Sequence, residues 1–149
     1  MPVQPVARSL VSVGRAVSDG QPVRLTPRAA AAWKRMRAAA TADGVDLQPV
    51  SGYRSVARQA RIIRRKLAAG QAITAILRVI AAPGCSEHHT GRAIDVGSAA
   101  NHALEEDFGR TAEFRWLKKH AARFGFRLSY PRRNRQGIVY EPWHWFWQE

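Results

Sequence analysis

Two short segments near opposite ends of the chain constrain its fold most, because together they offer one set of metal ligands. Residues 86–95 read SEHHTGRAID and contain an imidazole and a carboxylate seven positions apart, His88 and Asp95. Residues 141–144 read EPWH and contain another imidazole, with a carboxylate three positions before it. Three nitrogen or oxygen ligands with a fourth position open are typical of catalytic zinc sites, whereas structural zinc sites are usually closed by four ligands. A further acidic group beside the metal is what a hydrolase needs to accept a proton from bound water.

The length and composition fit one globular domain. A chain of 149 residues with 46% hydrophobic residues can bury one core. The single cysteine, Cys85, excludes an intrachain disulfide and a thiolate-rich metal site. No segment approaches the roughly 20 apolar residues of a membrane span, and residues 1–17 contain no apolar stretch of signal-peptide length. The location is therefore left open; a periplasmic or wall-facing location is expected only if the protein is exported.

The net charge of +13 is high for this length. Such a charge favours attraction to a polyanion, either nucleic acid or an anionic cell wall, but it also arises from solvated basic helix faces. Basic residues recur at helical spacing in one segment, at Arg58, Arg61, Arg64, Arg65 and Lys66. No nucleic-acid-binding motif accompanies them, so we predict no specific nucleic-acid partner, and we expect a monomer.

The predicted elements run from helices to strands, which indicates an α+β domain with helices packed on a small antiparallel sheet. Residues 1–22 show no periodicity and are expected to form a flexible arm, followed by a single domain over residues 23–149. Helices are predicted from the Thr26-Pro27 start to Ala42, after a Ser55 cap, over residues 72–80, and from Thr111 to Gly125. The apolar stripe of the second helix is expected at Val56, Ala60, Ile63 and Leu67. Strands are predicted at residues 47–50, 92–96, 126–130 and 138–147.

The strand over residues 92–96 alternates in character. Ala93 and Asp95 share one face, while Ile94 and Val96 face the core on the other. Aspartate is disfavoured in strands, so a metal-ligand role for Asp95 is the better explanation. Gly91 is expected to turn the chain so that His88 and Asp95 reach one ion.

Glu141 and His144 require a bend in the chain. Residues three apart on a flat strand face opposite sides, so Pro142 and Trp143 must bend the backbone if both side chains are to reach the metal. The aromatic residues that follow would form a wall of the cleft. Because this wall would desolvate Glu141, it would raise the pKa of Glu141 toward the range of a general base.

Several motifs, in order along the chain, resemble a known family. The pattern Ser86-x-His88-x-x-Gly91-x-Ala93-x-Asp95, followed by Glu141-x-x-His144, resembles the LAS metallopeptidases, the group that includes lysostaphin, D-alanyl-D-alanine metallopeptidases and the hedgehog signalling domain. The segments SGYRS at 51–55 with Gln59, PGCSEH at 83–88 and YEPWH at 140–144 resemble its D-alanyl-D-alanine carboxypeptidase branch, of the vancomycin-resistance type. The resemblance runs from about Leu25 to Trp147.

This resemblance implies a residue-by-residue assignment. His88, which matches the family spacing where His89 does not, would hold one Zn²⁺ with Asp95 and His144. Glu141 would deprotonate the bound water and pass the proton to the leaving amine. Arg54 would stabilise the tetrahedral intermediate, assisted by Gln59. The resemblance also implies substrate contacts at Ser86 and Trp143. His89 would either support a ligand or face the substrate. The implied substrate is a peptidoglycan stem peptide, cut at its terminal D-Ala.

Four other functions stay open at this point. An L,D-carboxypeptidase or an endolysin-type peptidoglycan endopeptidase would keep the site and change the bond, and the pocket for the substrate carboxylate would separate them. The sequence does not place that pocket. A zinc-bearing binding domain without turnover is disfavoured by Glu141 and Arg54, which a purely structural site does not need. A basic nucleic-acid-binding module comes last.

Overall fold

A four-stranded antiparallel sheet carries the two segments that bear the predicted ligands. Its strand order is β3-β4-β6-β5. The strands are β3 (Gln48–Ser51), β4 (Ala93–Gly97), β5 (Phe126–Leu128) and β6 (His144–Trp147). The structure is a computed structural model that describes residues 1–149.

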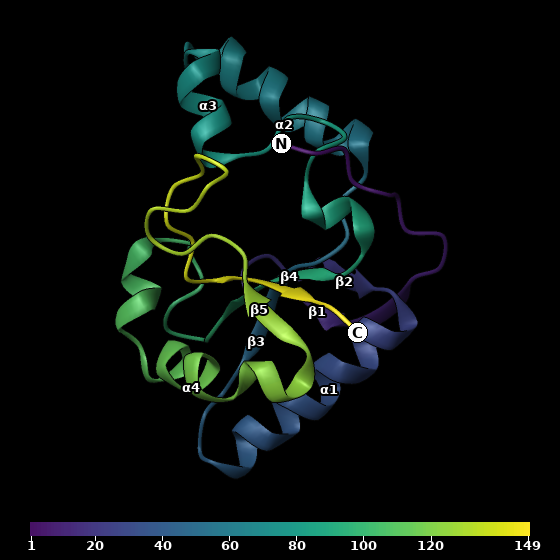
Figure 1. The fold of residues 1–149 in the computed structure, drawn as a ribbon, viewed down its shortest axis with the longest axis vertical. Helices are drawn as coiled ribbons and strands as arrows, with labels where there is room; N and C mark the ends of the chain where they lie inside the picture. Colours follow the sequence, from purple (N-terminus) through teal and green to yellow (C-terminus); the bar gives the residue numbers. More distant parts are fainter.

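Four α-helices surround this sheet. They are α1 (Pro27–Ala42), α2 (Val56–Ala68), α3 (Ile73–Val79) and α4 (Ala112–His120). Short 3-10 helices lie at Glu87–Thr90, Glu106–Arg110 and Ala121–Phe124. Figure 1 shows α2 and α3 at one end of the molecule and α1 and α4 toward the other, with the sheet between them. The predicted α+β class is confirmed, and no helix combines the length and apolar character needed to cross a bilayer.

The core lies between α1 and the sheet. Trp33, Met36 and Ala40 recur on one face of α1 and are buried together with Ile94 and Val96 of β4. Burying Ile94 and Val96 on this face leaves Asp95 on the opposite face, as the alternation predicted.

The predicted helix starts are largely confirmed. The Ser55 hydroxyl accepts a hydrogen bond from the Arg58 N–H at 3.0 Å, and the Thr111 hydroxyl accepts one from the Phe114 N–H at 3.1 Å. Such caps are each worth about 1 kcal/mol. Thr26 precedes α1 in an extended conformation, but its side chain makes no capping hydrogen bond.

The segment of residues 1–22, expected to be a flexible arm, contains a strand. Val11–Arg15 forms β1, which pairs antiparallel with β2 (Pro22–Leu25). Val13 is buried in the core cluster with Val23 and Leu25, because the hairpin covers one side of it. The sequence did not predict this hairpin, and the flexibility of the arm stays a prediction.

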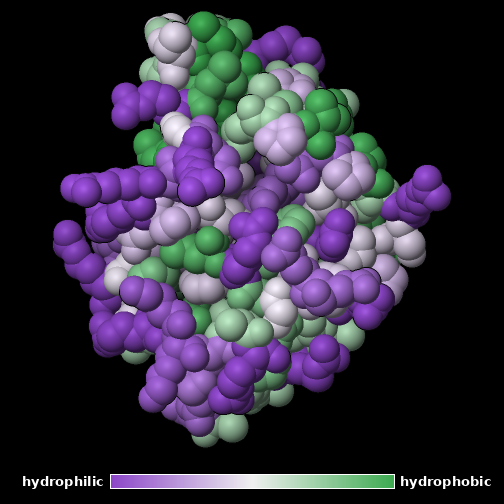
Figure 2. All heavy atoms as spheres, in the orientation of Figure 1, coloured by the Kyte–Doolittle hydropathy of each residue, from purple (hydrophilic) through white to green (hydrophobic).

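The apolar stripe predicted for α2 is confirmed only in part. Ile63 is buried as predicted, but Val56 and Leu67 are exposed at 37% and 43%, and Gln59 is buried. The physical reason is that α2 lines the cavity through Gln59 and Lys66 and contributes no residue to the main core. Figure 2 shows hydrophobic side chains gathered at the end of the molecule where α2 and α3 lie.

The last predicted strand is shorter than expected. Residues 138–143 lie outside any strand, and β6 begins only at His144. The N–H groups of this segment find other acceptors: Val139 donates to the Arg78 carbonyl at 2.9 Å and Glu141 to the Tyr130 carbonyl at 3.0 Å. Pro142 has no N–H to donate to a ladder.

Candidate active site

Strand register brings two of the predicted ligands together. Asp95 of β4 pairs directly with His144 of β6, and on its other side with Ser51 of β3. Residues directly opposite each other in an antiparallel pair present their side chains on the same face. Asp95 and His144 are both buried, and Asp95 Oδ1 lies 3.2 Å from His144 Nδ1.

His88 reaches the same point from the short helix Glu87–Thr90. The Ser86 hydroxyl begins this helix by accepting a hydrogen bond from the His88 N–H at 3.2 Å. Gly91 ends it with a φ of +68°, a conformation that disfavours other residues. His88 Nδ1 donates to the Gly52 carbonyl at 2.7 Å, so that Nε2 faces Asp95 Oδ2 at 3.3 Å. The backbone thus fixes both the ring orientation and the tautomer of His88.

The three predicted ligands form one cluster. Nitrogen and oxygen atoms of His88, Asp95 and His144 all lie within 4.8 Å of one another. Two imidazoles and one carboxylate, with room for a further ligand from the cavity, fit the donor set of a catalytic zinc ion.

A tight turn places Glu141 beside this cluster. Pro142 and Trp143 form the turn, and the His144 N–H donates to the Glu141 carbonyl at 3.2 Å. Glu141 Oε2 consequently lies 3.8 Å from His144 Nδ1, so the predicted bend is confirmed. Burial and the nearby Asp95 raise the pKa of Glu141 to about 7, against the opposing effect of His144. A carboxyl group with this pKa is suited to accept and release a proton near neutral pH.

The carboxylates make the cluster attractive to positive charge. Burial alone would lower the pKa of His144, but hydrogen bonds to Asp95 and Glu87 raise it to about 10. Burial would raise the pKa of Asp95, yet His88 and His144 hold it well below its ordinary range. Metal binding requires neutral imidazoles, so an ion at this point would displace the proton of His144 Nδ1.

Glu87 is a site residue that the sequence interpretation missed. Its Oε1 accepts hydrogen bonds from His144 Nε2 at 2.9 Å and from the Ser129 hydroxyl at 2.5 Å. Its Oε2 lies 3.3 Å from Arg127 Nη2. Glu87 therefore orients the His144 imidazole so that Nδ1 faces Asp95. Its position next to His88 in the motif was the available signal, but its partner His144 is 57 residues away.

Arg54 lies between β3 and α2, held by backbone and side-chain contacts. Its N–H donates to the His88 carbonyl at 3.1 Å, and Nη1 donates to Gln59 Oε1 at 2.9 Å. Gln59 is anchored in turn by donating to the Ala81 carbonyl at 2.7 Å. Burial lowers the pKa of Arg54, while Asp95 and Glu141, which line the same cavity, act in the opposite direction.

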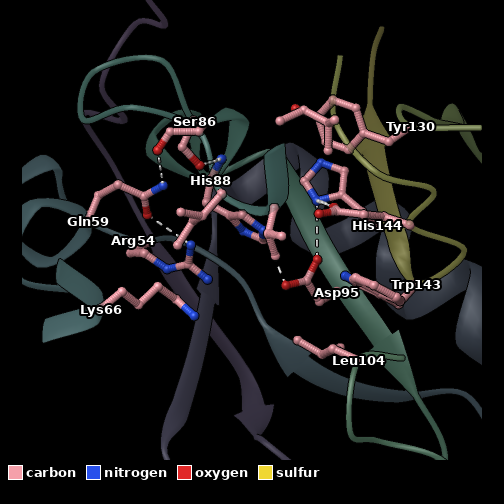
Figure 3. A pocket seen from close by; sticks show the side chains of 15 residues that line it. Arg54, Gln59, Lys66, Ser86, His88, Asp95, Leu104, Tyr130, Trp143 and His144 are labelled. Carbon is pink, nitrogen blue, oxygen red and sulfur yellow. Dashed lines mark hydrogen bonds and ion pairs between the residues drawn. The ribbon is translucent and has the colours of Figure 1, made fainter. Parts of the chain in front are cut away.

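Arg54, Gln59, Glu141 and the three predicted ligands line one cavity of about 210 Å³. Figure 3 shows Arg54, Gln59 and Ser86 on one side of it and His144 and Trp143 on the other. The cavity is also lined by residues that had no predicted role at the site, namely Lys66, Val79, Ile80, Ala81, Leu104, Tyr130 and Ile138.

His89 does not line the cavity, and the structure corrects its proposed place facing the substrate. It is fully buried, with Nδ1 donating to the Arg54 carbonyl at 2.7 Å and Nε2 accepting from the Gly84 N–H at 3.1 Å. Both ring nitrogens are thus occupied by the backbone. His89 therefore holds Arg54 and the loop before Ser86 in place. This is the supporting role, one of the two roles expected for this residue.

A family model and individual sequences both match this chain. The model described as VanY, D-alanyl-D-alanine carboxypeptidase, matches residues 22–149. The YodJ protein of Bacillus subtilis (strain 168) is 42% identical over 120 residues, which are 78% of this chain and 43% of YodJ. The bifunctional D-Ala-D-Ala dipeptidase and carboxypeptidase VanXYC of Enterococcus gallinarum is 36% identical over 82% of this chain and 66% of its own length. The chain thus spans less than half of YodJ.

Solved structures show the same fold. The LdcB LD-carboxypeptidase superposes with a TM-score of 0.85 at 34% identity, covering 98% of this chain and 71% of that one. VanYB in complex with D-alanine-D-alanine gives a TM-score of 0.73 at 29% identity, covering 99% and 80%. A VanY variant from a VanB-type resistance cassette, in complex with Zn(II), gives 0.71 at 29% identity, covering 99% and 86%.

Proposed function

This chain belongs to the VanY family of D-alanyl-D-alanine carboxypeptidases, and we propose that it removes the terminal D-alanine from peptidoglycan stem peptides with the help of zinc. The observation that carries the proposal is the convergence of His88, Asp95 and His144 with Glu141 and Arg54 at one cavity. The VanY structures with D-alanine-D-alanine and with Zn(II) support the substrate class and the metal. Such a substrate would place the protein on the wall-facing side of the cell membrane.

Zinc would be held by His88 Nε2, the Asp95 carboxylate and His144 Nδ1, and we expect one ion per chain. When bound, it supplies a Lewis acid that polarises the scissile carbonyl and makes water more acidic.

Glu141 is the group that moves the proton. Its carboxylate accepts a proton from the attacking water as the water oxygen bonds to the carbonyl carbon. The same carboxyl group then donates that proton to the nitrogen as the carbon–nitrogen bond breaks, so the leaving residue departs as an amine and Glu141 returns to its carboxylate form. The His144 backbone and the Pro142-Trp143 turn hold Glu141 in place for both steps.

Arg54 is the proposed stabiliser of negative charge on the carbonyl oxygen. If it meets charge that appears only in the transition state, Arg54→Ala should lower kcat about 10²–10³-fold and change KM much less. Steady-state kinetics on a D-Ala-D-Ala peptide would measure this. Arg54→Lys should restore little, because an ammonium lacks the planar fork. A pure rise in KM would instead assign Arg54 to ground-state substrate binding.

Glu87 is proposed to position His144 for the metal. Glu87→Gln keeps the size of the side chain but removes its charge, and zinc affinity should fall about 10- to 100-fold, as for other groups that orient metal-bound histidines. Competition with a chromogenic chelator would measure the affinity directly. The exposed Glu105→Gln, which removes the same charge elsewhere, should leave it unchanged. If the Glu87→Gln and unsubstituted proteins bound zinc with equal affinity, the role of Glu87 would be limited to its contacts with Ser129 and Arg127.

Release of free D-alanine tests the proposed function. The zinc-loaded protein should release it from a synthetic stem pentapeptide ending in D-Ala-D-Ala, lose this activity with a chelator and recover it with added zinc. Zinc binding without release from any stem peptide would favour the non-catalytic binding domain.

The similarity to LdcB favours a second candidate function, an L,D-carboxypeptidase. That enzyme would release D-alanine from the tetrapeptide, where the preceding residue has the L configuration. Parallel assays on pentapeptide and tetrapeptide therefore decide between the two carboxypeptidases.

A further inference from the structure

Lys66 differs from the other basic residues of α2 because it lines the active-site cavity. It lies seven residues after Gln59, about two helical turns, and therefore on the same face of the helix. Arg58, Arg61 and Arg65 are exposed on other faces. Figure 3 shows the Lys66 side chain next to Arg54, pointing into the space across from Asp95.

The Lys66 ammonium has no anionic partner within the protein. None of the salt bridges involves it, and none of the side-chain hydrogen bonds does. Val79 and Ile80 also line this part of the cavity, so the ammonium projects from a partly apolar wall. A half-buried cation in this setting gains most from an anion that arrives with a ligand.

The two cations of the cavity are not equivalent. Arg54 already donates to Gln59 and, through its backbone N–H, to the His88 carbonyl, which holds it beside a predicted ligand. Lys66 lies on α2 beyond Gln59, where it is free to meet a different part of the substrate. A peptide cut at its last bond carries one negative group close to the scissile carbonyl, its terminal carboxylate, which is present before and after the reaction.

From this arrangement we propose that Lys66 binds the terminal carboxylate of the substrate and so selects a chain end for hydrolysis. The inference rests on the proposed carboxypeptidase function and adds its missing part, the carboxylate pocket. An internal peptide bond offers only a neutral amide at this position, so Lys66 disfavours the endopeptidase alternative. D,D- and L,D-substrates end in the same carboxylate, so the assignment applies to both.

Binding measurements can test Lys66 without turnover. The Glu141→Gln protein, loaded with zinc, is titrated by calorimetry with a stem pentapeptide and with the same peptide as its C-terminal carboxamide. The free acid should bind more tightly than the amide. Adding Lys66→Met should weaken binding of the acid about 10- to 100-fold and leave the amide nearly unchanged, because a charge-assisted hydrogen bond is lost only with the acid. Lys66→Arg should keep part of the preference.

Arg65→Met is the matched control, since it removes one positive charge from the same last turn of α2 outside the cavity. It should preserve the acid-over-amide preference. The inference is overturned if Lys66→Met weakens both peptides equally, if it behaves like Arg65→Met, or if neither peptide binds. Hydrolysis of the free-acid peptide by the unsubstituted protein is measured separately, and it tests the proposed function independently of Lys66.

Discussion

Glu141→Gln should lower kcat for D-alanine release by about 10²–10⁴-fold while the zinc content stays the same. The amide keeps the shape of the side chain but cannot accept the proton of the attacking water. Because Glu141 lies 3.8 Å from His144 and outside the predicted ligand set, its replacement should leave metal binding intact. Rate measurements and elemental analysis on the same preparation would separate the two properties.

Glu105→Gln is the control for this experiment, because it removes an exposed carboxylate that does not line the cavity. Near-normal rates for Glu141→Gln would show that another group accepts the proton. Loss of zinc from Glu141→Gln would instead make Glu141 a ligand.

His144→Ala should abolish both zinc binding and D-alanine release. The substitution removes one of three ligands and also leaves the buried Asp95 and the partly buried Glu87 without their shared partner, so the cluster loses the geometry that a tetrahedral ion requires. His88→Ala and Asp95→Ala should give the same outcome. His120→Ala, which alters an imidazole on α4 away from the cavity, should retain both properties. Zinc content per chain after extensive dialysis is the readout, and unchanged content in the His88 or Asp95 variant would refute the assigned ligands.

The parts of the site that local sequence governs were predictable. Alternation in residues 93–96 orients Asp95 away from the core, and the structure confirms this because Ile94 and Val96 are buried on the other side. The three-residue spacing of Glu141 and His144 required a bend, which the Pro142-Trp143 turn supplies. The cluster itself was predictable only because the motifs resemble a known family, since 49 residues separate Asp95 from His144.

Features that depend on tertiary contacts were missed. In β1 the register shifts between Ser12 and Gly14, which hides the alternation that would have indicated a strand. The inward face of α2 was predicted only in part, because α2 lies over the cavity and contributes nothing to the main core, so Ile63 is buried while Val56 and Leu67 are exposed. Glu87 and Lys66 looked like ordinary charged residues, because the groups that give them a role come from distant segments.

The mass of a digested stem pentapeptide tests the central claim most directly. The zinc-loaded protein should convert it to a product lighter by one alanine, and a chelator should prevent the change. The Glu141→Gln protein should leave the peptide intact under the same conditions. An unchanged peptide with the zinc-loaded, unsubstituted protein, or a cut within the stem, would contradict the assignment of this site to a D-alanyl-D-alanine carboxypeptidase.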